Sequence, residues 1–116
     1  MSNIERIDVG PRMSEIVVHN GVAYLSGQLA NDPDGDIGAQ TREVLALIDG
    51  LLARVGSDRS RLLTASIWLR SMDDLAGMNA AWEAWLPAGA APARATVESA
   101  MVAPAFRVEI AVTAAV

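Results

Sequence analysis

The spacing of the apolar residues changes several times along this chain, and these changes constrain its fold more than any other feature. Residues 4–8, 16–18 and 22–28 have the alternating or β-branched character of strands. From Ile37 to Val55 the apolar residues recur with a helical period, which predicts an amphipathic helix. Beyond it, the patterns predict a strand over 62–69, a helix over 72–86, and strands over 93–100 and 106–114.

Turn residues support these boundaries. Asn20-Gly21 between β-branched runs predicts a hairpin, because both turn residues must adopt a positive φ. Gly56 stands where the left-handed residue that ends a helix belongs. The order is therefore three strands, helix, strand, helix and two strands (βββαβαββ). It predicts an α+β sandwich of two layers, in which a mixed six-stranded sheet carries both helices on one face.

Length and charge limit the classes of function. The chain has 116 residues, which suits one domain spanning residues 1–116. Its net charge is −5 and no block of basic residues occurs, so nucleic-acid binding is disfavoured. No apolar run approaches the roughly 20 residues of a membrane span, and residues 1–9 lack the apolar segment of a signal peptide. We therefore expect a cytoplasmic protein with no membrane partner.

Residue types exclude several kinds of site. No cysteine is present, which excludes a thiolate nucleophile and cysteine-based metal sites, and His19 is the only histidine. Asp32, Asp34 and Asp36 are spaced like part of a calcium loop. Pro33 and the lack of a glutamate at the twelfth position argue against calcium. We expect no metal site.

Two charged residues stand in otherwise apolar strands. Arg94 opens a strand that continues Ala95-Thr96-Val97, and it is either a surface arginine or a clamp for an anion. Glu109 lies on one strand face with Ala111 and Thr113, opposite Val108, Ile110 and Val112. It either faces solvent or is a carboxylate held in a cleft, where it could activate water.

Three weaker candidates accompany them. Ser26-Gly27-Gln28 ends a strand, and it is either a strand-ending bulge or a place where the glycine permits close backbone approach by a ligand or by another chain. Arg12 follows the Gly10-Pro11 break and is either a solvated loop arginine or a second guanidinium near a pocket. Asn79, in the second helix, either caps, bonds locally or faces a ligand.

Four segments together resemble the YjgF/RidA family, over essentially the whole chain. They are Ser26-Gly27-Gln28, residues 79–85 (Asn-Ala-Ala-Trp-Glu-Ala-Trp), residues 92–97 (Pro-Ala-Arg-Ala-Thr-Val) and Val108-Glu109-Ile110. The most specific part is Pro-Ala-Arg-x-x-Val, followed fifteen residues after the arginine by a glutamate in a β-branched strand.

The resemblance implies a chorismate-mutase-like fold and a homotrimer with clefts between its subunits. It implies that Arg94 binds the carboxylate of a small metabolite and that Glu109 positions the attacking water. Ser26, Gly27, Asn79 and Thr96 match positions that line the cleft. The implied activity is the hydrolysis of 2-imino or 2-enamine acids, such as 2-aminoacrylate or 2-iminobutanoate, to 2-oxo acids and ammonia, without a cofactor.

One motif departs from the family pattern. Many deaminating members have Gly-Pro-Tyr near the N-terminus, with the tyrosine in the cleft, whereas this chain has Gly10-Pro11-Arg12. The difference indicates a divergent branch, and a second arginine would suit a more anionic ligand. Three alternatives to the deaminase stay open: a trimer that binds a small carboxylate without turnover, a trimer whose clefts have lost any function, and the ribonuclease or translation inhibitor of older family labels. The acidic net charge counts against the last of these.

Overall fold

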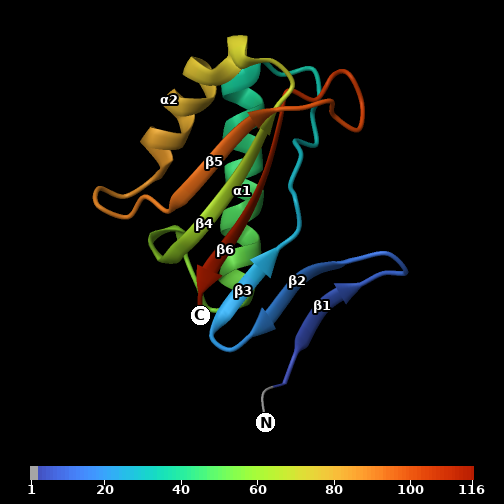
Figure 1. The fold of residues 1–116 in the computed structure, drawn as a ribbon, viewed down its shortest axis with the longest axis vertical. Coiled ribbons are helices and arrows are strands. Elements are labelled where there is room, and N and C mark those ends of the chain that lie inside the picture. The colour runs from blue at the N-terminus through green and yellow to red at the C-terminus, as the bar shows by residue number, and fades with distance from the viewer. Residues whose placement is uncertain (1–2) are drawn as a thin grey trace.

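A computed structural model of the chain describes residues 3–116 and shows one twisted sheet with two helices against it (Figure 1). The helices are α1 (Ile37–Arg54) and α2 (Leu75–Trp85). Short 3₁₀ turns, η1 (Arg59–Arg61) and η2 (Met72–Asp74), precede β4 and α2. The strands are β1 (Glu5–Val9), β2 (Ser14–His19), β3 (Val22–Leu25), β4 (Leu62–Leu69), β5 (Ala93–Glu98) and β6 (Val108–Ala115).

The six strands lie in the order β1-β2-β3-β6-β4-β5. β4 and β5 are parallel, and the other neighbouring pairs are antiparallel. The parallel pair is joined by α2, as a parallel connection requires a crossover. This arrangement confirms the predicted α+β class, the element order and the mixed six-stranded sheet, and it agrees with the chorismate-mutase-like fold that the resemblance implied.

Two boundaries differ from the sequence prediction by three residues, more than any other. β3 ends at Leu25 rather than at Gln28. The chain after β3 has one residue more than the facing part of β6 between the pair Tyr24↔Thr113 and the bridge Gln28↔Ile110, which interrupts the strand. This bulge contains Gly27. The second helix begins at Leu75, and its N-cap residue Asp74 makes no capping bond. The Asp74 carboxylate instead accepts a hydrogen bond from Arg107 Nη1 at 3.1 Å.

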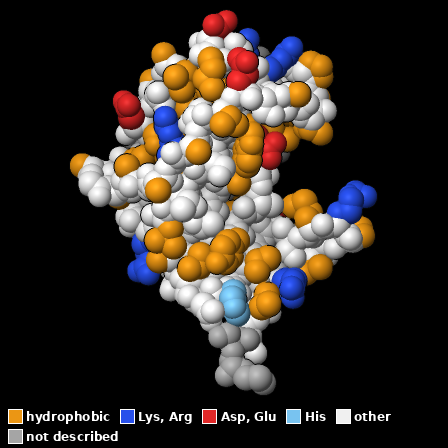
Figure 2. Space-filling model, viewed as in Figure 1, with side chains coloured by type: hydrophobic (Ala, Val, Ile, Leu, Met, Phe, Trp, Pro, Cys, Tyr) orange, Lys and Arg blue, Asp and Glu red, His pale blue; other side chains and the backbone are white. Residues whose placement is uncertain are grey.

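The two faces of the sheet have different surroundings. Alternate residues of β6 (Val108, Ile110, Val112 and Ala114) are buried under the helices, together with Ile67 and Leu69 of β4 and with α1 and α2 residues such as Ile48 and Met78. The other face, which we call the open face, carries no helix (Figure 1). It exposes Tyr24, Leu63 and Val97 by 47%, 44% and 48%, and Figure 2 shows hydrophobic side chains spread over it.

A buried glutamine fixes the start of β6. Gln40 of α1 is 1% exposed, and its side-chain amide donates to the carbonyl oxygens of Pro33, Gly35 and Ala105 at 3.0–3.1 Å. Its Oε1 accepts from the Arg107 backbone N–H at 2.9 Å. A buried amide with all of these partners holds two loops against the helix. The strand that carries Glu109 therefore begins at a defined place.

Candidate functional site

Arg94 lies on β5, at one edge of the sheet, and its side chain faces α2. Its Cα is paired with Ala65, which is buried on the helix-covered side, and paired residues share a face. Arg94 Nη1 donates to Asn79 Oδ1 at 2.8 Å, and the guanidinium carbon lies 5.9 Å from the centroid of the Trp82 ring. Both contacts orient the guanidinium, the second through the attraction of a cation to an aromatic face.

A shallow pocket of about 330 Å³ surrounds this group. Its lining comprises Asn79, Trp82, Glu83, Leu86, Ala91, Pro92 and Arg94. A guanidinium has five N–H donors, and Asn79 takes one of them. Within residues 3–116 Arg94 forms no salt bridge. The remaining donors can therefore bind a carboxylate through two parallel hydrogen bonds.

Thr96 lies two residues further along β5, on the same side as Arg94. It pairs with Ile67, whose side chain is buried beneath the helices. Its Oγ1 is buried and has no hydrogen-bond partner among the described residues. Because buried hydroxyls are usually paired, this oxygen is available to a group that the isolated chain does not supply.

Glu109 lies on the open face. The burial of β6 alternates from Val108 to Ala115 as the sequence predicted, with Glu109, Ala111 and Thr113 on the less buried side. Glu109 is half-buried and stands opposite Trp68 of β4. Its carboxylate rests against Gly27, where any Cβ would overlap Glu109 Oε2. The glycine of the Ser-Gly-Gln motif thus makes room for the carboxylate.

The other two residues of that motif bind a glutamate that the sequence did not single out. Ser26 Oγ donates to Glu15 Oε1 at 2.8 Å, and Gln28 Nε2 donates to the same oxygen at 2.7 Å. Glu15 lies in a strand beside Ile16 and Val17, so an acid within an apolar strand, the signal that identified Glu109, could also have identified Glu15. Ser26 is therefore turned toward Glu15.

Arg12 lies elsewhere in the isolated chain. It is exposed in the turn between β1 and β2, at the sheet edge opposite β5 (Figure 1). Val9 and Met13, which lie near it in the same turn, are 64% and 54% exposed. One chain alone does not bring Arg12 to Arg94.

The two principal candidates also lie apart. On β4, Ala65 pairs with Arg94 and Trp68 pairs with Glu109. Residues three apart on a strand point to opposite faces and are roughly 10 Å apart along it. One chain therefore brings Arg94 together with Asn79 and Thr96, and Glu109 together with Gly27, but it separates these two groups by the thickness of the sheet.

Residue types restrict the chemistry of the site further. The nine basic residues are all arginine, so no lysine amine is present to form a Schiff base. Within residues 3–116 there is no group of three His, Cys, Asp or Glu side chains that could hold a metal ion. In the same part of the chain, no helix is long and apolar enough to cross a membrane.

Comparison with known proteins places the chain among close relatives. The family model described as Endoribonuclease L-PSP matches residues 4–116. A RutC family protein of Haemophilus ducreyi is 43% identical over 113 residues, which is 97% of each chain. An uncharacterized protein from Pseudomonas aeruginosa has a TM-score of 0.94 at 45% identity, covering 97% of this chain and 98% of the other. NMB1025 of Neisseria meningitidis, a member of the YjgF protein family, has a TM-score of 0.93 at 45% identity, covering 97% and 94%.

Proposed function

Since this chain belongs to the endoribonuclease L-PSP (YjgF/RidA) family, a membership that supports a role in processing small molecules, we propose that it hydrolyses 2-imino and 2-enamine acids. In the proposed reaction the oxygen of water forms a bond to C2 of the imine, and the nitrogen takes up a proton. The C2–N bond then breaks, which gives a 2-oxo acid and ammonia. An imine carbon is already electrophilic, so the protein has mainly to orient the substrate and a water molecule.

Arg94 is the proposed carboxylate ligand, and its geometry is the observation that carries the proposal. Its guanidinium is oriented by Asn79 and Trp82, keeps unpaired donors and lines a pocket of about 330 Å³. A two-point contact with the carboxylate would fix the position of C2. Thr96 Oγ1 supplies a further polar group on the same strand face.

Glu109 is the proposed residue that positions water and exchanges protons with it. It cannot meet a substrate held at Arg94 of its own chain, because the two lie on opposite faces of the sheet. We therefore propose that the site forms between copies of the chain, with Arg94 from one subunit and Glu109 from its neighbour. The exposed apolar residues of the open face, such as Tyr24 and Leu63, support contact with another copy. A homotrimer with three such clefts is the proposed assembly.

Arg12 extends this proposal to substrate choice. It is exposed on a projecting hairpin between the apolar residues Val9 and Met13, which suits a contact with a neighbouring subunit. If it reaches the neighbour's Arg94 pocket, it adds a second guanidinium to that site. Such a site would favour 2-imino acids that carry a second carboxylate.

The absence of lysine and cysteine from the sequence shapes the proposed mechanism. Neither an amine nor a thiolate side chain is present to form a covalent intermediate with the imine carbon. Water itself must therefore be the nucleophile, and a carboxylate such as Glu109 is a suitable group to take its proton.

The test is to generate 2-aminoacrylate and 2-iminobutanoate in situ and to follow loss of the imine. We expect the wild-type protein to accelerate hydrolysis and Arg94→Ala to abolish the acceleration. Arg70→Ala is the matched control, because Arg70 is an exposed arginine at the end of β4 and makes no side-chain ion pair among the described residues.

If the folded wild-type protein does not accelerate hydrolysis of either compound, the proposed deaminase activity is excluded. The separation of Arg94 from Glu109 in one chain favours a specific alternative, a carboxylate-binding protein without turnover. In that case 2-oxobutanoate would bind to the wild type, fail to bind to Arg94→Ala and bind unchanged to Glu109→Gln.

A further inference from the structure

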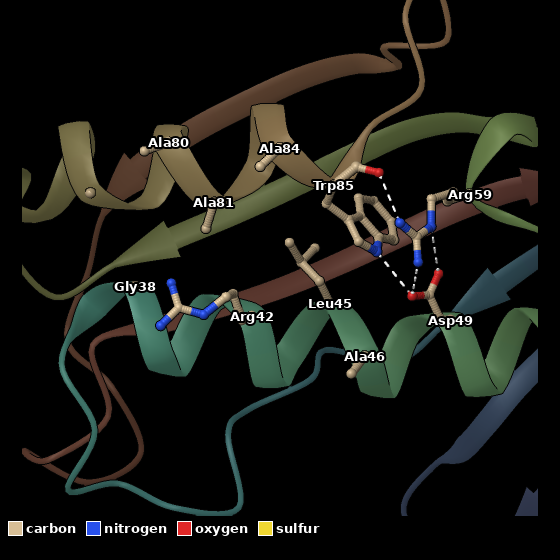
Figure 3. Close-up of a pocket in the computed structure, with 11 residues that line it drawn as sticks. Gly38, Arg42, Leu45, Ala46, Asp49, Arg59, Ala80, Ala81, Ala84 and Trp85 are labelled. Carbon is tan, nitrogen blue, oxygen red and sulfur yellow. Dashed lines mark hydrogen bonds and ion pairs between the residues drawn. The ribbon is translucent and has the colours of Figure 1, made fainter.

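A second cavity lies between the two helices, in the layer that covers the other side of the sheet from Glu109. Its volume is about 650 Å³, within the range of roughly 300–1,000 Å³ that is usual for small-ligand sites. Figure 3 shows Leu45 of α1 and Ala81 of α2 in its middle, with Arg42 toward one end and Trp85 at the other. None of these residues takes part in the Arg94 pocket.

Small side chains create this cavity. At the start of the helices, a Cβ on Gly77 would lie 2.6 Å from Ile37 Cγ2, so α1 and α2 are almost in contact there. Further along α2, Ala81 and Ala84 face α1, and their short side chains leave the space between the helices open. The helices therefore approach each other closely at Gly77, and the space is open toward solvent over Ala84, which is exposed.

At the Trp85 end, the cavity is lined by the indole ring and by Asp49 and Arg59, whose charges neutralise each other. Trp85 Nε1 donates to Asp49 Oδ2 at 3.0 Å, and Arg59 binds both oxygens of Asp49 at 3.1 and 2.5 Å. The Arg59 guanidinium carbon also lies 5.0 Å from the centroid of the Trp85 ring. These contacts hold the indole in place and neutralise Asp49, so this end offers an aromatic surface.

The Arg42 end offers a positive charge. Arg42 is exposed and forms no salt bridge or side-chain hydrogen bond within residues 3–116, in a chain whose net charge is −5. Its guanidinium lies over Gly38, where a Cβ would be 3.1 Å from Nη1. Arg42 and Asp49 are two helical turns apart, about 10 Å along α1. The cavity thus has a cationic end, an apolar middle and an aromatic end.

We propose that this cavity is a second binding site, for a small monocarboxylate with an apolar body. The carboxylate binds Arg42, and the body, about six to eight carbon atoms long by the spacing of the two ends, packs on Ala81, Ala84 and Trp85. The site favours an anionic ligand over a cationic one, because the only acid in its lining, Asp49, is already paired with Arg59. This site does not depend on the function proposed for Arg94.

The test is a titration with hexanoate, followed through the NMR signal of the Trp85 indole N–H, which is identified by its loss in Trp85→Phe. We expect a saturable shift of this signal. Arg42→Gln should weaken hexanoate binding at least about tenfold, as loss of a charge-assisted contact does. Ala84→Leu should weaken it as well, because the added side chain fills the cavity.

Two controls separate this site from others. Hexylammonium has the same apolar body with the opposite charge and should not shift the Trp85 signal. Arg94→Gln should leave the hexanoate titration at Trp85 unchanged. Arg42 and Ala84 are both exposed, so their substitution should not prevent folding. The proposal is overturned if hexanoate gives no saturable shift, or if Arg42→Gln changes its affinity less than about threefold.

Discussion

The two faces of the sheet differ in how completely a single chain covers them. Beneath the helices, Ile67, Val108 and Ile110 are at most 1% exposed, and Arg94 at the margin of this layer is oriented by two neighbours. On the open face, the Glu109 carboxylate lies against Gly27, but apolar side chains on this face remain exposed. The covered face thus carries the pocket in which we propose that Arg94 binds a carboxylate, whereas the open face carries Glu109 and the exposed apolar residues that we propose contact another subunit.

The largest effect should come from the covered face. Ile110→Ala removes a fully buried side chain and should lower the free energy of unfolding by about 2–5 kcal/mol. The control is Ser66→Ala on the open face, which should cost no more than about 0.5 kcal/mol. Urea denaturation at one protein concentration measures both. Equal costs would show that the two faces are equally packed.

Gly27→Ala should damage the open face without unfolding the protein. The new Cβ would displace the flexible Glu109 carboxylate, and we expect kcat for imine hydrolysis to fall about 100-fold or more. The control is Gly50→Ala in α1, where a Cβ meets nothing within 4 Å. It should leave kcat unchanged and should stabilise the helix by about 1 kcal/mol. If Gly27→Ala retains full activity, the position of Glu109 does not matter.

Arg94→Lys should separate binding from chemistry. A lysine ammonium cannot make two parallel hydrogen bonds to a carboxylate, so KM should rise about tenfold with a smaller change in kcat. Glu109→Gln should do the reverse and lower kcat with little change in KM. Steady-state kinetics of the two variants decide this. If both variants mainly raise KM, Glu109 acts in binding.

The smallest effect concerns the link between β1 and α1. Arg54 donates to Asp8 at 2.7 Å, and this hydrogen bond holds the pKa of Asp8 below its usual value. A lowered pKa in the folded state stabilises the protein above the unfolded value of about 3.9, and this stabilisation is lost as the pH falls through the folded value. Asp8→Asn should slightly lower Tm near neutral pH, and the difference from wild type should vanish in strong acid. A difference that persists in strong acid would contradict an electrostatic origin.

Much of the fold followed from local patterns in the sequence. The alternation in β6 correctly put Val108 and Ile110 on one face and Glu109 on the other, because a strand with one buried face must alternate. A bulge at Ser26-Gly27-Gln28 was one of the two interpretations of that motif, and the structure confirms it. Its partner strand was not predictable, because the register between β3 and β6 joins segments that are distant in the sequence.

The site was harder to predict than the fold. Arg94 and Glu109 were each singled out as a charged residue in an apolar strand and were joined into one site by the family resemblance. Strand alternation alone does not say which face of the sheet each occupies relative to the other. That relation depends on how β5 and β6 both align with β4. Glu15 could have been identified as an acid within an apolar strand, but its partners could not, because Ser26 and Gln28 become its neighbours only through the pairing of β2 with β3.

The most direct test of the account asks whether Arg94 and Glu109 of different subunits form one site. Arg94→Ala and Glu109→Gln proteins, each inactive alone, would be unfolded together, refolded as a mixture and assayed for imine hydrolysis. If each site takes Arg94 from one subunit and Glu109 from its neighbour, random mixing restores about one quarter of the sites, and activity returns. If mixed oligomers form and stay inactive, the two residues do not act across a subunit interface.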